Sequence, residues 1–403
     1  MKFNFYKKVL KNGMTIIFEK RDVPVVCVAF AVRNGGINES LEEKGISHFI
    51  EHLLYKGTPT RSAKQIAEEI EKKGGILNGF TDEEITAYWC KMPSEHLKIT
   101  LDVLSDMIKN PKFDVKELEK ERKVIFEEIK MRKDNPQIYT FDKIEGFLYD
   151  GTLGIPLIGT YDTMNSITRE KIVEKFKQIY SPNNMILCIV GNADFKEIID
   201  FAEKNFGNEK EKIPEQKFSL KNEEKIEKRN GLDQANLIFA YHVPLAGDKK
   251  CYSAKVLGVL MAEGMSSILF SEIREKRNLA YSIRGGSEIN KRFAYNLIYA
   301  GTMKKNVGIV KKIILEEFKK VADSITEKEL NQVKEQIVGN YHISIDDSQD
   351  QMMSLLHSEI STNAEDFYEF EKNIMAVKIE DVKKIAEEAV KNHSFFALVP
   401  EKD

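Results

Sequence analysis

Hydrophobic positions along the chain follow either the two-residue period of strands or the 3.6-residue period of amphipathic helices. In the first half, this pattern predicts a strand hairpin over residues 14–32, with its turn near Asp22–Pro24. The other elements predicted there are a helix starting at Gly45, helices over 62–75, 94–110 and 115–133, and strands over 76–92 and 184–193.

The second half repeats this plan. Residues 114–128, DVKELEKERKVIFEE, resemble residues 326–340, TEKELNQVKEQIVGN, at an offset of 212 positions. Such self-similarity indicates a duplication. The predicted elements are strands over 235–245, 279–289 and 292–302, and helices over 249–264, 265–276, 305–324 and 326–341.

The two halves predict an α+β fold of two homologous domains, each a largely antiparallel β-sheet with helices packed on one face. Strands mixed with pairs of helices favour antiparallel sheets over a regular parallel βαβ repeat. Residues 209–228 are rich in charge and poor in aliphatic periodicity, which is typical of a solvated linker. We therefore expect a first domain over 1–208, a linker over 209–228 and a second domain over 229–403.

The composition is that of a globular protein, with 42% hydrophobic and 31% charged residues among 403. The net charge of −3 provides no basic field for nucleic acid or an anionic membrane. No uncharged apolar run reaches the length of about 18 residues that a membrane span needs. The N-terminal residues lack the features of a signal peptide, and the four cysteines form no CxxC pair. These features favour a cytoplasmic protein.

Three ionisable residues interrupt the apolar helix that starts at Gly45. His48 and His52 are four positions apart, so they lie on the same face of a helix, where two imidazoles can bind one zinc ion. Glu51 precedes the second histidine, which is where a base for a zinc-activated water is needed. The order is H-x-x-E-H, the inverse of the commoner H-E-x-x-H. The plainer alternative is two surface histidines beside a helical glutamate.

A catalytic zinc site usually has three protein ligands, and the helix over 115–133 supplies candidates for the third. Glu121 and Glu128 are seven positions apart and differ by only about 20° around a helix axis. Val124 and Ile125 lie between them on the same stripe, so both carboxylates are predicted to face inward. Glu127 points to the outer face, which leaves Glu128 as the candidate ligand. The alternative is a solvated, glutamate-rich helix.

The second half does not preserve this polar cluster. No histidine lies between His242 and His342, and the offset of 212 places Val333 opposite Glu121 and Asn340 opposite Glu128. A purely structural role would more naturally have survived in both copies. We infer that the metal site belongs to the first half alone.

The motif H48-F-I-E-H52, followed by Glu128 within ERKVIFEE, resembles the pitrilysin family of zinc peptidases, the inverzincins that include insulin-degrading enzyme and mitochondrial processing peptidase. The likeness spans essentially the whole chain. It implies a processing-peptidase-like metallohydrolase fold with one Zn²⁺ per chain, bound by His48, His52 and Glu128. It also implies that Glu51 is the general base and that Glu121 is a supporting acidic residue of the catalytic centre.

The same resemblance assigns roles to residues that the sequence pattern alone leaves open. Asn78, Gly79 and Phe80 match the family's N-A-[FY]-T stretch, an exposed sheet edge to which substrate adds as a strand. Gly79 replaces the usual alanine, a small departure that puts the firmness of this edge in doubt. Without the family, the stretch is an ordinary strand with a glycine bulge.

In the second half, GMSSILFSEIREKRNLAYSI is similar to the family's arginine–tyrosine segment and places Arg274 and Tyr281 in that pair. A guanidinium and a phenol can stabilise the oxyanion that forms during attack on a peptide bond. Without the family, Arg274 is an ordinary solvated helix charge.

The sequence thus predicts a zinc metalloendopeptidase that hydrolyses unfolded peptides in an enclosed chamber. Longer members of the family carry the arginine–tyrosine pair in their last quarter, facing the zinc domain. A chain of the half-length type would need a second copy, so we expect a homodimer in which each active site is completed in trans. The alternatives are a non-catalytic or partner subunit of a processing-peptidase-like complex, and a module that binds peptide or stores zinc without turnover.

Overall fold

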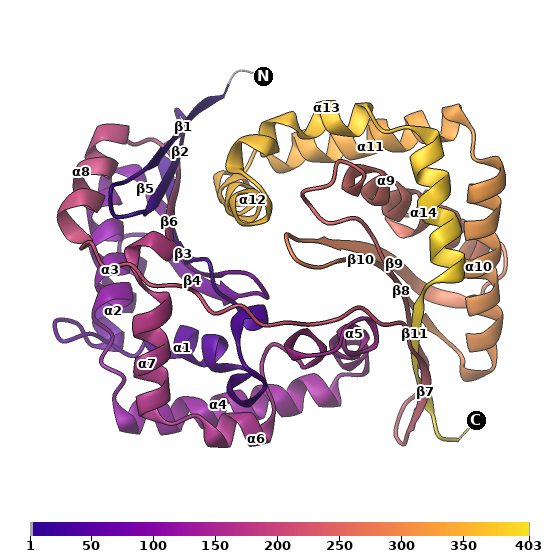
Figure 1. Ribbon diagram of the computed structural model, residues 1–403, viewed down its shortest axis with the longest axis horizontal. Coiled ribbons are helices and arrows are strands. Elements are labelled where there is room, and N and C mark those ends of the chain that lie inside the picture. Colours follow the sequence, from indigo (N-terminus) through magenta and orange to yellow (C-terminus); the bar gives the residue numbers. More distant parts are fainter. Residues whose placement is uncertain (1–2, 403) are drawn as a thin grey trace. The chain divides into compact units, whose positions relative to one another are not determined.

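The computed structural model describes residues 3–402, and the chain forms two compact units (Figure 1). Unit 1 contains the chain up to Lys130 together with Gly151–Lys217 and Ser344–Ile360. Unit 2 contains Met131–Asp150, Phe218–Ile343 and the chain from Ser361 onward. Each unit is built around one mixed but largely antiparallel sheet, which confirms the predicted α+β class.

The sheet of unit 1 has six strands in the order β1-β2-β6-β3-β5-β4. Neighbouring strands are antiparallel except for β2 and β6, which are parallel. The strands are β1 (Asn4–Val9), β2 (Thr15–Lys20), β3 (Val25–Val32), β4 (Ile76–Thr81), β5 (Thr86–Pro93) and β6 (Met185–Gly191).

Two sequence predictions within this sheet are wrong. The hairpin over 14–32 does not form, because β6 lies between β2 and β3 and pairs with both. Every residue of β6 is buried, as expected for a central strand covered on both faces. The single strand over 76–92 is a hairpin of β4 and β5, whose turn is closed by Asp82 N–H donating to Ile85 O at 2.7 Å. Alternation of apolar residues identifies strands, but it does not say which strands are neighbours.

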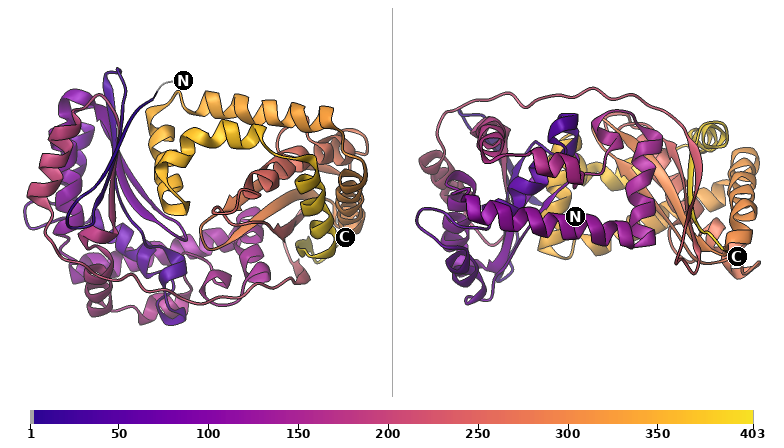
Figure 2. Two further views of the ribbon diagram at one scale, coloured as in Figure 1. Left: turned by 45° about the horizontal axis from the view of Figure 1, so that its top comes forward. Right: turned by 90° about the horizontal axis from the view of Figure 1, so that it is seen from below.

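Helices cover one face of the unit 1 sheet, and Figure 2 shows this helical layer along the sheet. Their buried side chains, among them Phe49 and Leu104, form one core with inward-facing strand residues such as Phe18 and Phe30. The helices are α1 (Ile46–Leu54), α2 (Ala63–Glu71), α3 (Leu97–Lys109), α4 (Val115–Asp134), α6 (Tyr161–Ser166), α7 (Arg169–Ile179) and α8 (Phe195–Asn205).

The sheet of unit 2 has five strands in the order β7-β11-β8-β10-β9, with β7 and β11 parallel and the other pairs antiparallel. The strands are β7 (Glu224–Arg229), β8 (Ala235–His242), β9 (Ala280–Ile289), β10 (Ala294–Thr302) and β11 (Ser394–Pro400). Among the helices of this unit are α9 (Cys251–Ala262), α10 (Val307–Ser324), α11 (Glu327–Ser344), α13 (Phe370–Met375) and α14 (Ile379–Lys391). Within residues 3–402, none of the helices combines the length and the apolar character that crossing a bilayer requires.

Among the helices that the sequence analysis missed are two that each pack on a sheet formed mainly by the other half of the chain. α5 (Pro136–Leu148) belongs to unit 2, where Phe141 stacks on Tyr299 of β10 at 5.4 Å between ring centroids. α12 (Ser348–Ser361) belongs mainly to unit 1, where Gln351 Nε2 donates to Glu19 Oε2 of β2 at 2.7 Å. The first residues of α5 and α12 are separated by the same offset of 212 that separates those of α4 and α11. Equivalent helices of the two halves are therefore exchanged.

Because of this exchange, the compact units do not follow chain order. Residues 209–223 contain no helix or strand, as expected of the predicted linker, and β7 begins at Glu224 inside the stretch that the prediction includes in it. The boundaries at 208 and 229, which concern the homology of the two halves, stay a prediction.

The start of α1 is fixed by a buried carboxylate. Glu39 accepts hydrogen bonds from the backbone N–H groups of Gly45 at 2.8 Å and Ser47 at 2.7 Å, which satisfies two donors of the first turn. Burial raises the pKa of Glu39, whereas the nearby Lys44 ammonium and the two N–H groups oppose that shift. Gly45 has a φ of +95°, and a Cβ there would lie 2.7 Å from the carbonyl oxygen of Ile158. Glycine is therefore required at the turn into the helix.

We predict that Glu39→Gln lowers the free energy of unfolding by about 1–3 kcal/mol, the cost of leaving a buried polar group without its partner. An amide offers one acceptor oxygen where the carboxylate offers two, and its NH₂ would face a backbone donor. Chemical denaturation measures the change. Glu42→Gln, at an exposed site on the same approach to α1, is the control and should stay within about 0.5 kcal/mol of wild type. Equal stability of the two variants would contradict this account.

Candidate metal centre

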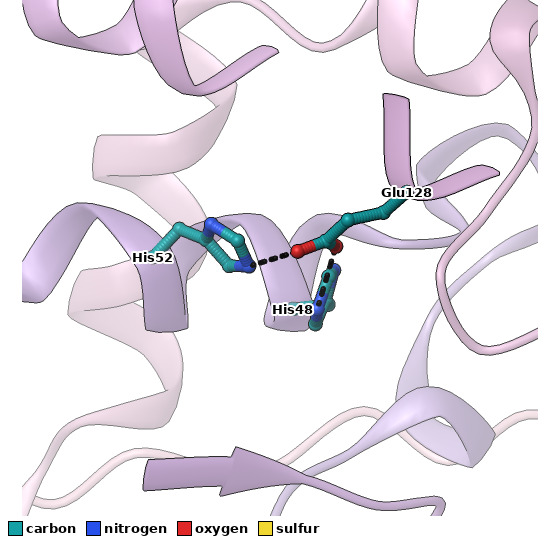
Figure 3. A group of neighbouring side chains, drawn as sticks. All are labelled: His48, His52 and Glu128. Carbon is teal, nitrogen blue, oxygen red and sulfur yellow. Dashed lines mark ion pairs between the residues drawn. The ribbon is translucent and has the colours of Figure 1, made fainter. Parts of the chain in front are cut away.

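Three side chains of unit 1 converge to form a candidate metal site (Figure 3). His48 and His52 come from α1 and Glu128 comes from α4, and their ligand atoms all lie within 4.8 Å of one another. Nε2 of His48 lies 3.7 Å from Oε2 of Glu128, and Nε2 of His52 lies 3.8 Å from Oε1 of the same carboxylate. Bonds of about 2.0–2.1 Å to a tetrahedral zinc ion would separate ligand atoms by roughly 3.4 Å. The donor set and its spacing therefore fit zinc.

The local fold explains why these side chains face each other. α1 buries Ile46, Phe49, Ile50 and Leu53, which leaves the two histidines and Glu51 on its half-buried side. On α4, Ile125 is fully buried and anchors the helix in the core. Val124 is 43% exposed, so its predicted place on the inward stripe is wrong. The stripe is narrower than predicted, but it still carries Glu121 and Glu128 inward, whereas Glu127 is exposed.

Glu121 forms an outer layer of the site. Its Oε2 lies 3.1 Å from Nδ1 of His52, and its Oε1 lies 2.7 Å from Nζ of Lys56. A carboxylate on Nδ1 fixes the orientation of the imidazole and directs Nε2 to the metal, a common arrangement around metal-binding histidines. The structure thus places Glu121 against the candidate ligand His52 rather than among the candidate ligands. Lys56, which the sequence analysis missed, balances the charge of this 7%-exposed carboxylate.

Glu51 lies on the same helix turn as the histidines and is half-buried. Oγ1 of Thr81 donates a hydrogen bond of 2.7 Å to its Oε2. Burial raises the pKa of Glu51, whereas the hydrogen bond from Thr81 and the His52 ring act in the opposite direction. A carboxylate with a raised pKa is a better proton acceptor, which suits a general base. Thr81 was missed as a contributor, although it directly follows the predicted edge residues.

Asn78, Gly79 and Phe80 lie on β4, which is the last strand in the order of the unit 1 sheet and so forms an edge. Thr81 is the last residue of the same strand and hydrogen-bonds to Glu51, so this edge strand ends beside Glu51. A Cβ at position 79 would lie 2.5 Å from Oη of Tyr55 and 2.9 Å from the carbonyl oxygen of Ala87. The space of an alanine side chain is therefore occupied by Tyr55, four residues after Glu51, and this explains the departure to glycine.

Arg274 and Tyr281 lie in unit 2, on the lining of a cavity of about 800 Å³. Arg274 belongs to a π-helical turn (Phe270–Glu275), and its guanidinium lies 4.7 Å from the ring centroid of Phe270. Such turns are frequent at functional sites. Within residues 3–402, one cluster of potential metal ligands is found, and it lies in unit 1.

A helix-borne pair of histidines, a carboxylate from a second helix and an adjacent glutamate form a donor set of the kind that metal-dependent hydrolases use. The chain belongs to peptidase family M16: residues 15–161 match Insulinase (Peptidase family M16), and residues 166–337 match the Peptidase M16 inactive domain. This confirms the resemblance to the pitrilysin family. The second match is described as an inactive domain, which agrees with the finding that the three candidate metal ligands lie in the first half.

Curated relatives support the same assignment, and solved structures share the fold. An "Uncharacterized zinc protease" of Rickettsia felis is 34% identical over 84% of each chain, and one of Bacillus subtilis is 33% identical over 85% of each. A protease from Helicobacter pylori has a TM-score of 0.91 at 21% identity, covering 99% of this chain and 100% of its own. A putative M16-like peptidase from Alicyclobacillus acidocaldarius has a TM-score of 0.87 at 18% identity, covering 100% and 99%. These structures confirm the predicted fold.

We predict that Glu128→Gln weakens zinc binding by more than about 100-fold, because even partners outside the coordination sphere change metal affinity by 10–100-fold. Titration with zinc against a chelating dye measures the affinity. Glu127→Gln removes the same charge from the exposed neighbouring position and should bind zinc as wild type does. If both variants kept wild-type affinity, Glu128 would not be a ligand.

Proposed function

We propose that the protein is a zinc metalloendopeptidase that hydrolyses unfolded peptides, with His48, His52 and Glu128 holding one Zn²⁺ and Glu51 acting as the general base. The observation that carries this proposal is the convergence of the three ligand atoms beside a half-buried glutamate. The names of the relatives, zinc proteases, support the same chemistry.

The chemistry that zinc supplies in such sites is Lewis acidity, which makes water a nucleophile near neutral pH. The residues of the chain carry out the proton transfers. Glu51 accepts the proton of the attacking water and later passes it to the leaving amine. Thr81 holds one carboxylate oxygen of Glu51, which leaves the other free to accept the proton. Glu121 keeps the His52 ring oriented throughout.

The edge strand β4 is proposed to bind the substrate. A peptide that adds to this edge is held by main-chain hydrogen bonds, so it must be extended but needs no particular sequence. Because Thr81 lies at the end of β4 and contacts Glu51, a peptide on this edge would run past the base. Asn78, Gly79 and Phe80 are the residues proposed to contact it.

Arg274 and Tyr281 are proposed to stabilise the oxyanion of a substrate bound to a second copy of the chain. In this homodimer, each zinc site is completed by the partner subunit's Arg274 and Tyr281. A cytoplasmic location completes the proposal, in keeping with four free cysteines, all of them buried.

A second function has one observation in its favour. A structure from Pseudomonas fluorescens, described as a peptidase M16 inactive domain, has a TM-score of 0.88 at 16% identity, covering 98% of each chain. A protein described as inactive thus has the same fold. The competing function for this chain is therefore that of a non-catalytic partner subunit. Cleavage of a quenched fluorescent peptide by the purified chain, abolished by a chelator and restored by zinc, separates the two.

We predict that Glu51→Gln lowers kcat by about 10²–10⁴-fold, the usual contribution of a general base, while zinc binding is retained. His52→Ala should lose both zinc and activity, because it removes a ligand. Peptide cleavage and metal content, measured on the same preparations, provide the check. A fully active Glu51→Gln variant would exclude Glu51 as the base.

We predict that two inactive variants restore each other. In a mixed dimer of Glu51→Gln and Tyr281→Phe chains, one of the two sites combines an intact base with an intact tyrosine. Random exchange of subunits in an equal mixture should therefore return about a quarter of the wild-type activity, as follows from two-fold symmetry. No recovery after verified exchange, or an active monomer in sedimentation at assay concentration, would contradict completion in trans.

A further inference from the structure

Tyr281 occupies an irregular position in the sheet of unit 2. In the pairing of β9 with β10, Ala280 is opposite Thr302 and Ser282 is opposite Gly301, so Tyr281 is an extra residue without a partner position. Two residues on one strand that oppose one position on the other form a β-bulge, and bulges re-aim side chains. Tyr281 is 61% exposed and lines the cavity described above.

Two contacts hold this exposed tyrosine in place. Its ring packs against Gly301 of β10, where an added Cβ would lie 3.3 Å from Cε1 of Tyr281. Nε2 of Gln234, the residue before β8, donates a hydrogen bond to the phenol oxygen. Gln234 and Arg274 line the same cavity as Tyr281. Tyr281 is therefore more constrained than its exposure alone would suggest, because the bulge, Gly301 and the amide of Gln234 hold its side chain in place.

The direction of the hydrogen bond determines what the phenol can do. Because Oη accepts the amide hydrogen of Gln234, its own hydrogen remains available for another acceptor. A hydroxyl that accepts a hydrogen bond is also polarised, which strengthens it as a donor. An oxyanion requires a donor of this kind at a fixed position.

We propose that Gln234 is a positioning residue that orients the hydroxyl of Tyr281 so that it donates to the carbonyl oxygen of a bound peptide. The inference rests on the proposed peptidase function and adds to it a residue that acts through Tyr281. It also gives the bulge a role, because bulges re-aim the side chains that they carry.

The test compares Gln234→Leu with Gln234→Glu. Leucine removes the donor and should lower kcat by about 2–10-fold, the range for one neutral hydrogen bond, with little change in KM. Glutamate keeps the length and shape of the side chain, but an ionised carboxylate only accepts hydrogen bonds, so it would capture the hydroxyl hydrogen of Tyr281. Its kcat should fall further, by at least about 10-fold, because a charge-assisted bond is stronger.

A merely structural tether predicts the opposite order, because glutamate still ties the tyrosine whereas leucine does not. Gln234→Glu with wild-type kcat would therefore overturn the proposal. Gln332→Glu, exposed on α11, introduces the same charge outside the cavity and is the control. In a Tyr281→Phe background, neither substitution at position 234 should lower kcat any further. If kcat still fell as much in that background, the loss would come from misfolding and not from Tyr281, which would contradict the proposal.

A second readout does not depend on turnover. Binding of a fluorescent peptide to Glu51→Gln protein, measured by anisotropy, should weaken when Gln234→Glu is added. Wild-type protein that cleaves no peptide at all would overturn the proposed function, and this inference with it. Wild-type protein that cleaves, together with position-234 variants of unchanged kcat and peptide affinity, would overturn this inference alone.

Discussion

The contact between α1 and α4 in unit 1 is the constraint on which the site depends. Two imidazoles four residues apart on one helix meet two carboxylates seven residues apart on the other, so each histidine is within 4 Å of a carboxylate oxygen. Buried carboxylates are costly unless they are paired. Lys56 and His52 offset that cost for Glu121, and the same pairing orients the ring of His52, a candidate ligand. The stability of unit 1 and the proposed metal binding thus rely on the same few contacts, and Glu39 fixes the start of the helix that carries them.

Glu51, the proposed base, and β4, the proposed substrate edge, are coupled in a similar way. Thr81 joins the end of β4 to Glu51, and Tyr55 fills the space beneath Gly79. The position of the edge is therefore set by α1 itself, the helix that carries the histidines. Tyr55 occupies the volume that an alanine side chain at position 79 would need, and the looser edge expected from Gly79 stays a prediction.

The site was predictable because helical spacing is local: residues 48 and 52, or 121 and 128, share a face whatever the surrounding fold. The pairing of helices and the order of strands are not local. Nothing in residues 14–32 indicates that β6, from residue 185, inserts between β2 and β3. Contacts such as Thr81–Glu51 or Gln234–Tyr281 depend on side chains that meet only after the sheets form, and no spacing rule identifies them.

The exchange of α5 and α12 bears on how the two halves became one protein. Each half leaves one face of its sheet to be covered by the equivalent helix of the other half. Neither half would bury its sheet by itself, so separating the two halves would expose an apolar face on both pieces. Reciprocal exchange of the same element is what domain-swapped dimers of identical chains do. This arrangement is expected if two identical ancestral chains first exchanged this helix as a dimer and their two gene copies later fused into one.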